Sequence, residues 1–226
     1  MTHKPQAVLW DMDGTLVDTE PYWMAAETAL VESFGGTWSH EQALQLVGSG
    51  LHESAEILRA AGVDMDADAI VSHLTDAVRE LLETQGVPFR PGARELLRDL
   101  QVAGIPSALV TMSLGRMARS VIDLIDFPAF DVVVPGDEVD YPKPHPEPYL
   151  KASRLLDIDI ADALVIEDSP TGLRAGIASG AVTLGVPHIV PLDGLGAHAL
   201  WPTLEGRTAG DIVDLYAAVT SVEVGR

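Results

Sequence analysis

Two aspartates stand two positions apart near the start of the chain, in the segment Asp11-Met12-Asp13-Gly14-Thr15. Because like charges repel, two carboxylates that face one crevice require a bound cation or a shared proton between them. Gly14 has no side chain and allows the backbone to approach a ligand closely. An ordinary acidic turn uses the same residue types, so this segment alone leaves both interpretations open.

A second acidic pair, Glu167-Asp168, follows an apolar run much later in the chain. A cluster of carboxylate oxygens without nitrogen or sulfur donors suits hard Mg²⁺, which takes few protein ligands and keeps several waters. The alternative is a solvated loop in which Asp168 or Ser169 caps a helix that begins at Pro170. The pair indicates a metal site only in combination with the first two aspartates.

A hydroxyl-bearing segment and a lysine complete the set of residue types that phosphoryl transfer requires. Thr111-Met112-Ser113 lies where a strand should give way to a helix, and hydroxyls and free backbone N–H groups there can hold a phosphoryl oxygen. Simple helix capping is the alternative. Lys143 stands between two prolines and can neutralise both a phosphate and a carboxylate cluster, although a solvated loop lysine is again the alternative.

These segments need a scaffold that brings them together, and short apolar runs predict one. The expected strands cover residues 7–10, 107–110, 132–134, 163–166 and 182–184. The expected helices between them cover residues 92–103, 114–125, 146–156 and 170–179. This alternation predicts an α/β fold with a doubly wound, Rossmann-like parallel sheet. The carboxyl ends of parallel strands face one crevice, so the four segments should meet there.

One interval interrupts this alternation. Residues 19–85 show helical composition and periodicity and no convincing strand. We therefore predict an all-helical insertion over residues 19–85, after the first strand. Residues 1–18 and 86–226 should form the Rossmann-like core.

The composition limits the possible partners. The chain has 226 residues with 34 acidic and 14 basic ones, a formal net charge of −20, which should repel nucleic acid and anionic membranes. An anionic substrate must therefore be held by a local positive site. There is no cysteine, no apolar N-terminal stretch of signal-peptide length and no run that could span a bilayer. We expect a soluble, cytoplasmic protein whose oligomeric state the sequence leaves open.

The ordered set of Asp11-Met-Asp-Gly-Thr, Thr111, Lys143 and Glu167-Asp168 resembles the haloacid dehalogenase-like phosphohydrolases, over residues 6 to about 190. The resemblance implies a Rossmann-like core and a mobile helical cap. It implies that Asp11 is the nucleophile and Asp13 the general acid/base, that Thr111 binds phosphate and that Lys143 neutralises charge. Backbone and side-chain groups of the neighbouring Gly14, Met112 and Ser113 are expected to contact the phosphate.

The resemblance also implies a cofactor and a substrate class. Mg²⁺ would be held by Asp11, Asp168 and the backbone carbonyl of Asp13, with Glu167 near its waters. The stretches DMDGTLVDTEPYW and YPKPHPEPYL look most like the sugar-phosphate phosphatases of the family, so the expected partner is a small phosphorylated metabolite. Glu20 and Trp23 begin the cap and could contact that substrate, while packing between cap helices accounts equally well for the tryptophan.

Three other functions share parts of this residue set. In the sugar phosphomutases of the family a histidine and a cap arginine align with Trp23 and Leu51, so this chain lacks both. True dehalogenases lack the second aspartate, and phospho-accepting signalling modules lack the helical insertion. His52, His145 and His188 have no ligand-like spacing and are interpreted as incidental. We therefore expect a Mg²⁺-dependent phosphatase that forms an aspartyl-phosphate, with a β-phosphoglucomutase-like activity as the main alternative.

Overall fold

The computed structural model describes residues 4–47 and 49–223 and contains a six-stranded sheet in which every pairing is parallel. The strand order is β3-β2-β1-β4-β5-β6. The strands are β1 (Ala7–Trp10), β2 (Ser107–Val110), β3 (Val132–Val134), β4 (Ala163–Glu167), β5 (Val182–Gly185) and β6 (Ala199–Leu200). The predicted doubly wound, Rossmann-like α/β class is confirmed, with β6 as a short strand that the sequence pattern did not predict.

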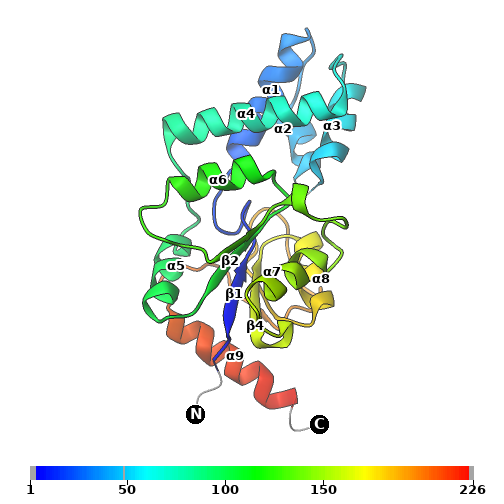
Figure 1. The fold of residues 1–226 in the computed structure, drawn as a ribbon. Coiled ribbons are helices and arrows are strands. Elements are labelled where there is room, and N and C mark those ends of the chain that lie inside the picture. Colours follow the sequence, from blue (N-terminus) through cyan, green and yellow to red (C-terminus); the bar gives the residue numbers. More distant parts are fainter. Residues whose placement is uncertain (1–3, 48, 224–226) are drawn as a thin grey trace.

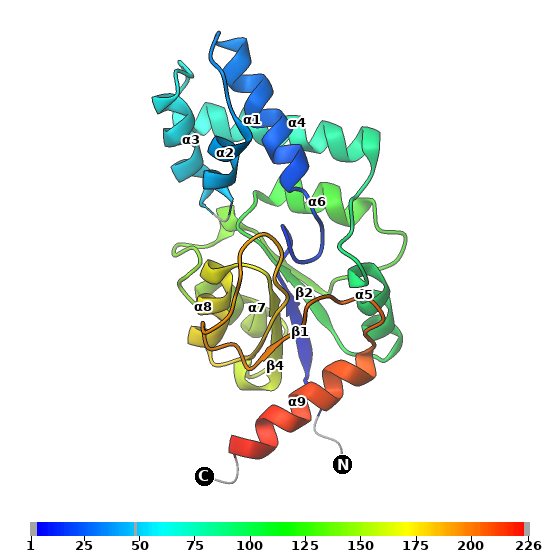
Figure 2. The same cartoon turned by 180° about the vertical axis from the view of Figure 1, so that it is seen from behind.

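Helices cover both faces of this sheet. They are α5 (Ala93–Val102), α6 (Gly115–Asp123), α7 (Glu147–Leu155), α8 (Pro170–Ser179) and α9 (Ala209–Glu223), with short 3₁₀ helices η2 (Gly136–Glu138) and η3 (Ile160–Asp162). Figures 1 and 2 show α7 and α8 on one side of the sheet and α5 on the other. Strands β1, β2, β4 and β5 are buried along their whole length, which explains their uninterrupted apolar sequences.

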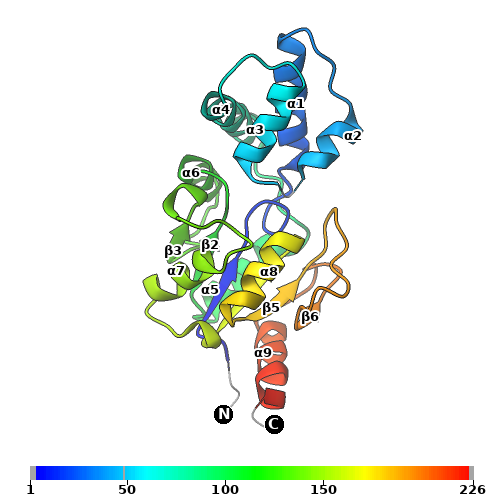
Figure 3. The same cartoon turned by 90° about the vertical axis from the view of Figure 1, so that its right-hand side faces the viewer.

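A group of helices lies beyond the carboxyl end of β1, and we call it the cap. It consists of α1 (Glu20–Ser33), α2 (His40–Ala43), the 3₁₀ helix η1 (Leu44–Leu46), α3 (Leu51–Ala60) and α4 (Ala67–Gln85). Figure 3 shows these helices stacked above the sheet. The apolar side of α4, which includes Ile70, Leu74 and Val78, is buried against its neighbours. No helix in the described part of the chain is long and apolar enough to cross a membrane.

The cap is joined to the core by two backbone connections and by a polar contact between helices. The connections pair with each other through an antiparallel bridge between Val17 and Phe89. Helix α4 of the cap lies over α6 of the core (Figure 1). There Arg116 donates to the backbone oxygen of Ser72 at 2.9 Å, and Arg79 donates to Ser120 Oγ at 2.8 Å. These contacts set the orientation of the cap over the strand ends.

Candidate active site

The residues singled out in the sequence lie at the carboxyl ends of three adjacent strands. Asp11 follows β1, Thr111 follows β2, and Glu167 is the last residue of β4. Since β1 pairs with both β2 and β4, their ends meet at one edge of the sheet. Lys143 reaches this edge from the loop that precedes α7. The topology therefore brings together Asp11 and Glu167, which are 156 positions apart in the chain.

The ammonium of Lys143 connects two acidic side chains at this edge. Its Nζ donates to Asp11 Oδ1 and to Glu167 Oε1, each at 2.7 Å, and to the Val110 backbone oxygen at 2.9 Å. The lysine is 8% exposed and the glutamate is fully buried. Burial would lower the pKa of Lys143, but the charges of Asp11 and Glu167 outweigh it and raise that pKa above its usual range. The lysine is therefore a permanently charged centre of the site.

Tyr149 on α7 supports this ion pair and was not singled out in the sequence. Its hydroxyl donates to Glu167 Oε1 at 2.7 Å, and Lys143 Nζ lies 4.9 Å from the centre of its ring. The other oxygen of Glu167 accepts from the backbone N–H of Asp168 at 3.2 Å and from Ser169 Oγ at 3.2 Å. Both oxygens of Glu167 are thus fixed in place. The only sequence signal for Tyr149 was its position within the YPKPHPEPYL stretch.

Three carboxylates form a cluster that could hold a cation. Oxygen atoms of Asp11, Glu167 and Asp168 lie within 4.8 Å of one another. Burial, followed by the charge of Glu167, raises the pKa of Asp11 to about 7, although Lys143 opposes the shift. Burial and the charge of Asp11 also raise the pKa of Asp168 well above its usual range. Among the ion pairs of the described residues, the Lys143 ammonium is paired with Asp11 and Glu167 but not with Asp168. A cluster of oxygen donors with this surplus of negative charge fits a hard divalent cation.

Gly14 and Thr15 explain why the Asp-x-Asp-Gly-Thr order matters to this cluster. Gly14 has a positive φ of 90°, and a Cβ at this position would overlap the carboxylate of Asp168. Thr15 Oγ1 donates to Asp168 Oδ1 at 2.9 Å. The residues after the first strand therefore shape the position of an aspartate more than 150 positions away. The expected contact between Gly14 and phosphate stays a prediction.

Asp13 has different surroundings from those of Asp11. Its Oδ1 accepts from Thr19 Oγ1 at 2.5 Å. Its Oδ2 accepts from Ser113 Oγ at 2.7 Å and from Thr111 Oγ1 at 3.3 Å. The carboxylate cluster found among residues 4–47 and 49–223 does not include the Asp13 side chain. The geometry separates the two aspartates into one held by an ammonium and one held by hydroxyls.

The remaining predicted contact residues surround these two aspartates. Met112 lies between the two hydroxyl residues, and its sulfur accepts from the Lys143 backbone N–H at 3.4 Å. Burial and then the charge of Asp13 raise the pKa of Glu20, the first residue of α1, to about 7. Trp23 is 9% exposed and belongs to the main apolar core, so packing accounts for it in this structure. Their contacts with a substrate stay predictions.

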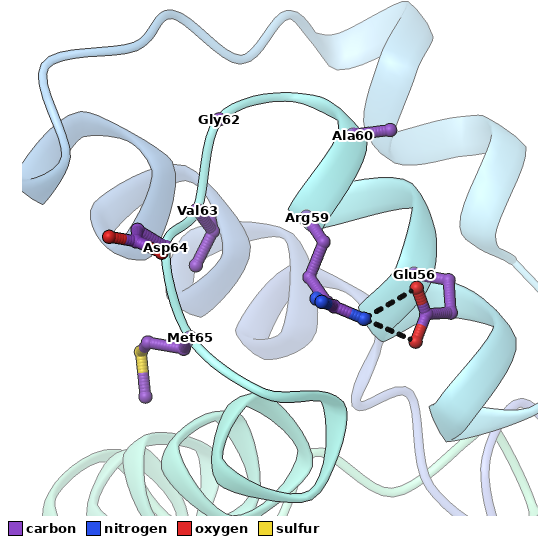
Figure 4. Close-up of a pocket in the computed structure, with 7 residues that line it drawn as sticks. All are labelled: Glu56, Arg59, Ala60, Gly62, Val63, Asp64 and Met65. Atoms are coloured by element: carbon purple, nitrogen blue, oxygen red, sulfur yellow. Dashed lines mark hydrogen bonds and ion pairs between the residues drawn. The ribbon is translucent and has the colours of Figure 1, made fainter.

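An open hollow on the cap is separate from this site. It lies at the end of α3 and the loop that follows, and Figure 4 shows Arg59 paired there with both oxygens of Glu56 at 2.9 Å. Its lining residues are Glu56, Arg59, Ala60, Gly62, Val63, Asp64 and Met65. None of the predicted site residues is among the described residues that line it. The hollow therefore lies apart from the carboxylate cluster at the strand ends.

Comparison with known proteins identifies relatives over most of the chain. The sequence profile of the haloacid dehalogenase-like hydrolases matches residues 8–186. Hexitol phosphatase A of Escherichia coli is 33% identical over 219 residues, which are 91% of this chain and 96% of that protein. The bifunctional riboflavin kinase/FMN phosphatase of Arabidopsis thaliana is 32% identical over 186 residues, or 80% of this chain. The chain spans about half, 48%, of the length of that plant protein.

Solved structures show the same architecture. CbbY from Rhodobacter sphaeroides, determined in complex with phosphate, matches with a TM-score of 0.82 and 27% identity over 92% of this chain and 99% of that one. A β-phosphoglucomutase from Clostridium difficile matches with a TM-score of 0.80 over 98% of this chain and 100% of that one. At 20% identity, this second likeness concerns the fold alone.

We predict that Gly172 is required for the position of Glu167. An added methyl group at residue 172, in the first turn of α8, would occupy the space of the Glu167 carboxylate. Gly172→Ala should therefore lower the free energy of unfolding by about 1–3 kcal/mol, measured by urea denaturation. Gly210→Ala on α9 is the matched control, because its added Cβ meets Thr208 Oγ1 only at 3.4 Å. Equal effects of the two substitutions on stability would contradict the assignment.

Proposed function

Because the chain belongs to the haloacid dehalogenase-like hydrolases, we propose that it hydrolyses small phosphate monoesters, sugar phosphates in particular, through a phosphorylated Asp11. The names of the relatives support this class of substrate, since hexitol phosphatase A is similar over 96% of its length. The proposal rests on the different side-chain partners of two aspartates that are two positions apart. Asp11 is paired with the Lys143 ammonium, whereas Asp13 is held by hydroxyl groups.

In the first step Asp11 is the nucleophile. The positive charge of Lys143, 2.7 Å away, favours its ionised form and opposes the effect of burial. A carboxylate oxygen of Asp11 attacks phosphorus, the bond to the ester oxygen breaks, and a protonated Asp13 gives its proton to the leaving alkoxide. Lys143 also stabilises the negative charge on the phosphoryl group as it moves. The products are the free alcohol, an acyl-phosphate on Asp11 and ionised Asp13.

In the second step Asp13 acts as a base. The hydroxyls of Thr19, Ser113 and Thr111 donate hydrogen bonds to its side chain and hold it in position. Asp13 removes a proton from water as the water oxygen attacks phosphorus. The bond between phosphorus and Asp11 breaks, and inorganic phosphate and the Asp11 carboxylate are released. Asp13 regains the proton that it gave up in the first step.

We propose Mg²⁺ as the resident cofactor. By the resemblance to the family, Asp11, Asp168 and the Asp13 backbone carbonyl would hold it, with Glu167 near its waters. When bound, the ion supplies positive charge against the transferring phosphoryl group. The Glu167 oxygens are fixed by Lys143, Tyr149 and neighbouring backbone groups, which suits Glu167 to hold its neighbours in place.

We also propose that residues 19–85 form a mobile cap over a core made of residues 1–18 and 86–226. The two backbone connections and the polar contact between α4 and α6 provide a defined resting position. Closure over the strand ends would exclude water and select the substrate through Glu20 and Trp23. The expected partner is a small phosphorylated metabolite in the cytoplasm, and the net charge of −20 opposes nucleic acid and anionic membrane.

A sugar phosphomutase is the second candidate, because both reactions begin with a phosphorylated aspartate. A mutase must hold its phosphorylated sugar intermediate and protect the acyl-phosphate from water while the sugar reorients. Leu51 cannot make the charge-assisted bonds of an arginine to a phosphate. Trp23 offers one indole donor and no base. Water should therefore reach Asp11 before a sugar hydroxyl does, and net hydrolysis is expected.

We predict net phosphate release from a panel of hexose, hexitol and pentose phosphates, with β-glucose 1-phosphate included. Free phosphate and phosphosugar isomers are followed together, so that hydrolysis and isomerisation compete in one assay. Asp11→Asn should lower turnover by roughly three orders of magnitude or more, because an amide is a poor nucleophile. The exposed Asp123→Asn on α6 is the control and should behave as wild type. Accumulation of glucose 6-phosphate well ahead of free phosphate would replace the phosphatase with a mutase.

We predict that Mg²⁺ raises the melting temperature, and does so more as the pH rises through about 7. The pKa of Asp11 is raised from an ordinary 3.8 to about 7, so protonation of Asp11 stabilises the folded protein when no metal is bound. This stabilisation is complete below pH 3.8 and is lost as the pH rises through about 7. Mg²⁺ binds the deprotonated carboxylates, so it restores stability at the higher pH.

Differential scanning fluorimetry with EDTA or Mg²⁺, on both sides of that pKa, measures the effect. Asp168→Asn should remove most of the increment, and the exposed Asp64→Asn should leave it intact. An increment that is absent, or equal on the two sides of the pKa, would show that this carboxylate cluster is not the Mg²⁺ site.

A further inference from the structure

Three hydrogen-bonded side chains, Asp18, His188 and Arg90, join segments that are far apart in the sequence. His188 Nε2 lies 2.9 Å from Asp18 Oδ1, and Nδ1 of the same ring contacts Arg90 Nη1. A guanidinium can only donate, so Nδ1 accepts, and the ring proton on Nε2 is left to donate to Asp18. The spacing of His188 in the sequence gave no indication of these two contacts. We call the three residues the hinge clamp.

The hinge clamp lies where the cap joins the core. Asp18 and Arg90 belong to the two backbone connections, which are held together by bonds from Asp18 N to Pro88 O at 2.7 Å and from Arg90 N to Leu16 O at 3.0 Å. His188 comes from a third segment, the loop after β5. The histidine therefore fixes the two connections to a loop of the core.

That loop is itself anchored at the catalytic edge of the sheet. The backbone N–H of Val186 donates to the backbone oxygen of Glu167 at 2.7 Å, two residues before His188. Arg90 Nη2 adds a bond to the Pro187 backbone oxygen at 3.2 Å. The side chains of His188 and Asp18 are 17% and 36% exposed, so the contact between them is partly shielded from water.

The clamp also borders the residue that holds Asp13. Asp18 is followed by Thr19, whose hydroxyl donates to Asp13 Oδ1 at 2.5 Å. Gly14 N donates to Val17 O at 2.7 Å, which ties the residue before Asp18 to the turn after β1. A displacement of Asp18 therefore moves Thr19 relative to Asp13. Since a shift of about 1 Å in a reacting group can cost a hundredfold in rate, the clamp bears directly on proton transfer.

We propose that His188 is a positioning residue for the reaction. Through Asp18 it holds the Thr19 hydroxyl against Asp13 and keeps that carboxyl in line with the leaving group. The proposal rests on the proposed function, in which Asp13 protonates the leaving alkoxide. It predicts a loss that depends on the leaving group, because alkoxides need a proton to depart and phenolates need it much less.

The test compares an alkyl phosphate with an aryl phosphate in single-turnover measurements of leaving-group release. His188→Ala and Asp18→Ala should each slow release from the alkyl phosphate roughly tenfold or more, and from the aryl phosphate less than about threefold. The double variant should be no slower than either single one, because both break the same contact. The ratio of the two rates does not depend on the fraction of folded enzyme, so partial unfolding cannot imitate the result.

His198→Ala is the matched control. Its ring Nδ1 also accepts a bond, from the Thr183 backbone N–H at 3.0 Å, and it lies in the same stretch after β5 without contacting Asp18 or Arg90 among the contacts of the described residues. Its rate ratio should match that of wild type. Equal losses on both esters in His188→Ala, or additive losses in the double variant, would overturn the proposal while leaving the phosphatase intact. A wild-type protein that cleaves neither ester would overturn both.

Discussion

The ion pair between Lys143 and the carboxylates of Asp11 and Glu167 is the contact on which the rest of the site depends. A lysine that is 8% exposed requires negative partners, because a lone charge is costly to bury. Both partners lie at 2.7 Å, and they come from the ends of neighbouring strands. The parallel order of β1 and β4 is thus what makes the buried lysine tolerable. Loss of the lysine would leave acidic groups facing one another without compensation.

A second consequence is that Asp11 and Asp13 lie in different surroundings, which the different roles proposed for them require. A separation of two residues places one carboxylate on the lysine and the other among the hydroxyls of Thr19, Thr111 and Ser113. A group that must attack benefits from a permanent positive charge, whereas a group that must give and take a proton benefits from neutral neighbours. One edge of the sheet can therefore place a charged partner beside Asp11 and hydroxyl partners beside Asp13, two residues further along the chain.

The sequence predicted the elements and contacts that follow directly from local residue types. Uninterrupted apolar runs identified β1 to β5, and the rule that parallel strand ends share one edge predicted that Asp11, Lys143 and Glu167 would meet. A two-residue strand such as β6 has too few positions to show a period. Helix α9 was also missed, although its buried Ile212 and Tyr216 pack it onto the core.

Long-range contacts account for the other omissions. In the sequence Tyr149 cannot be told apart from an ordinary core aromatic residue. Only the fold brings its hydroxyl to Glu167. From the sequence alone, Gly172 is only a poor helix former. The structure shows that the Glu167 carboxylate fills the space that a side chain at residue 172 would occupy. His188 has no partner nearby in the sequence, because its contacts are 98 and 170 positions away. Spacing along the chain cannot reveal such pairs.

Phosphorylation of Asp11 itself can be detected by rapid acid quenching during turnover. Acyl-phosphates are stable in acid for long enough that the protein can be digested and the masses of its peptides measured by mass spectrometry. We expect one phosphoryl group on the peptide that contains Asp11, and borohydride reduction should convert that aspartate alone to homoserine. A phosphoryl group on another residue, or none at all while phosphate is being released, would rule out Asp11 as the nucleophile.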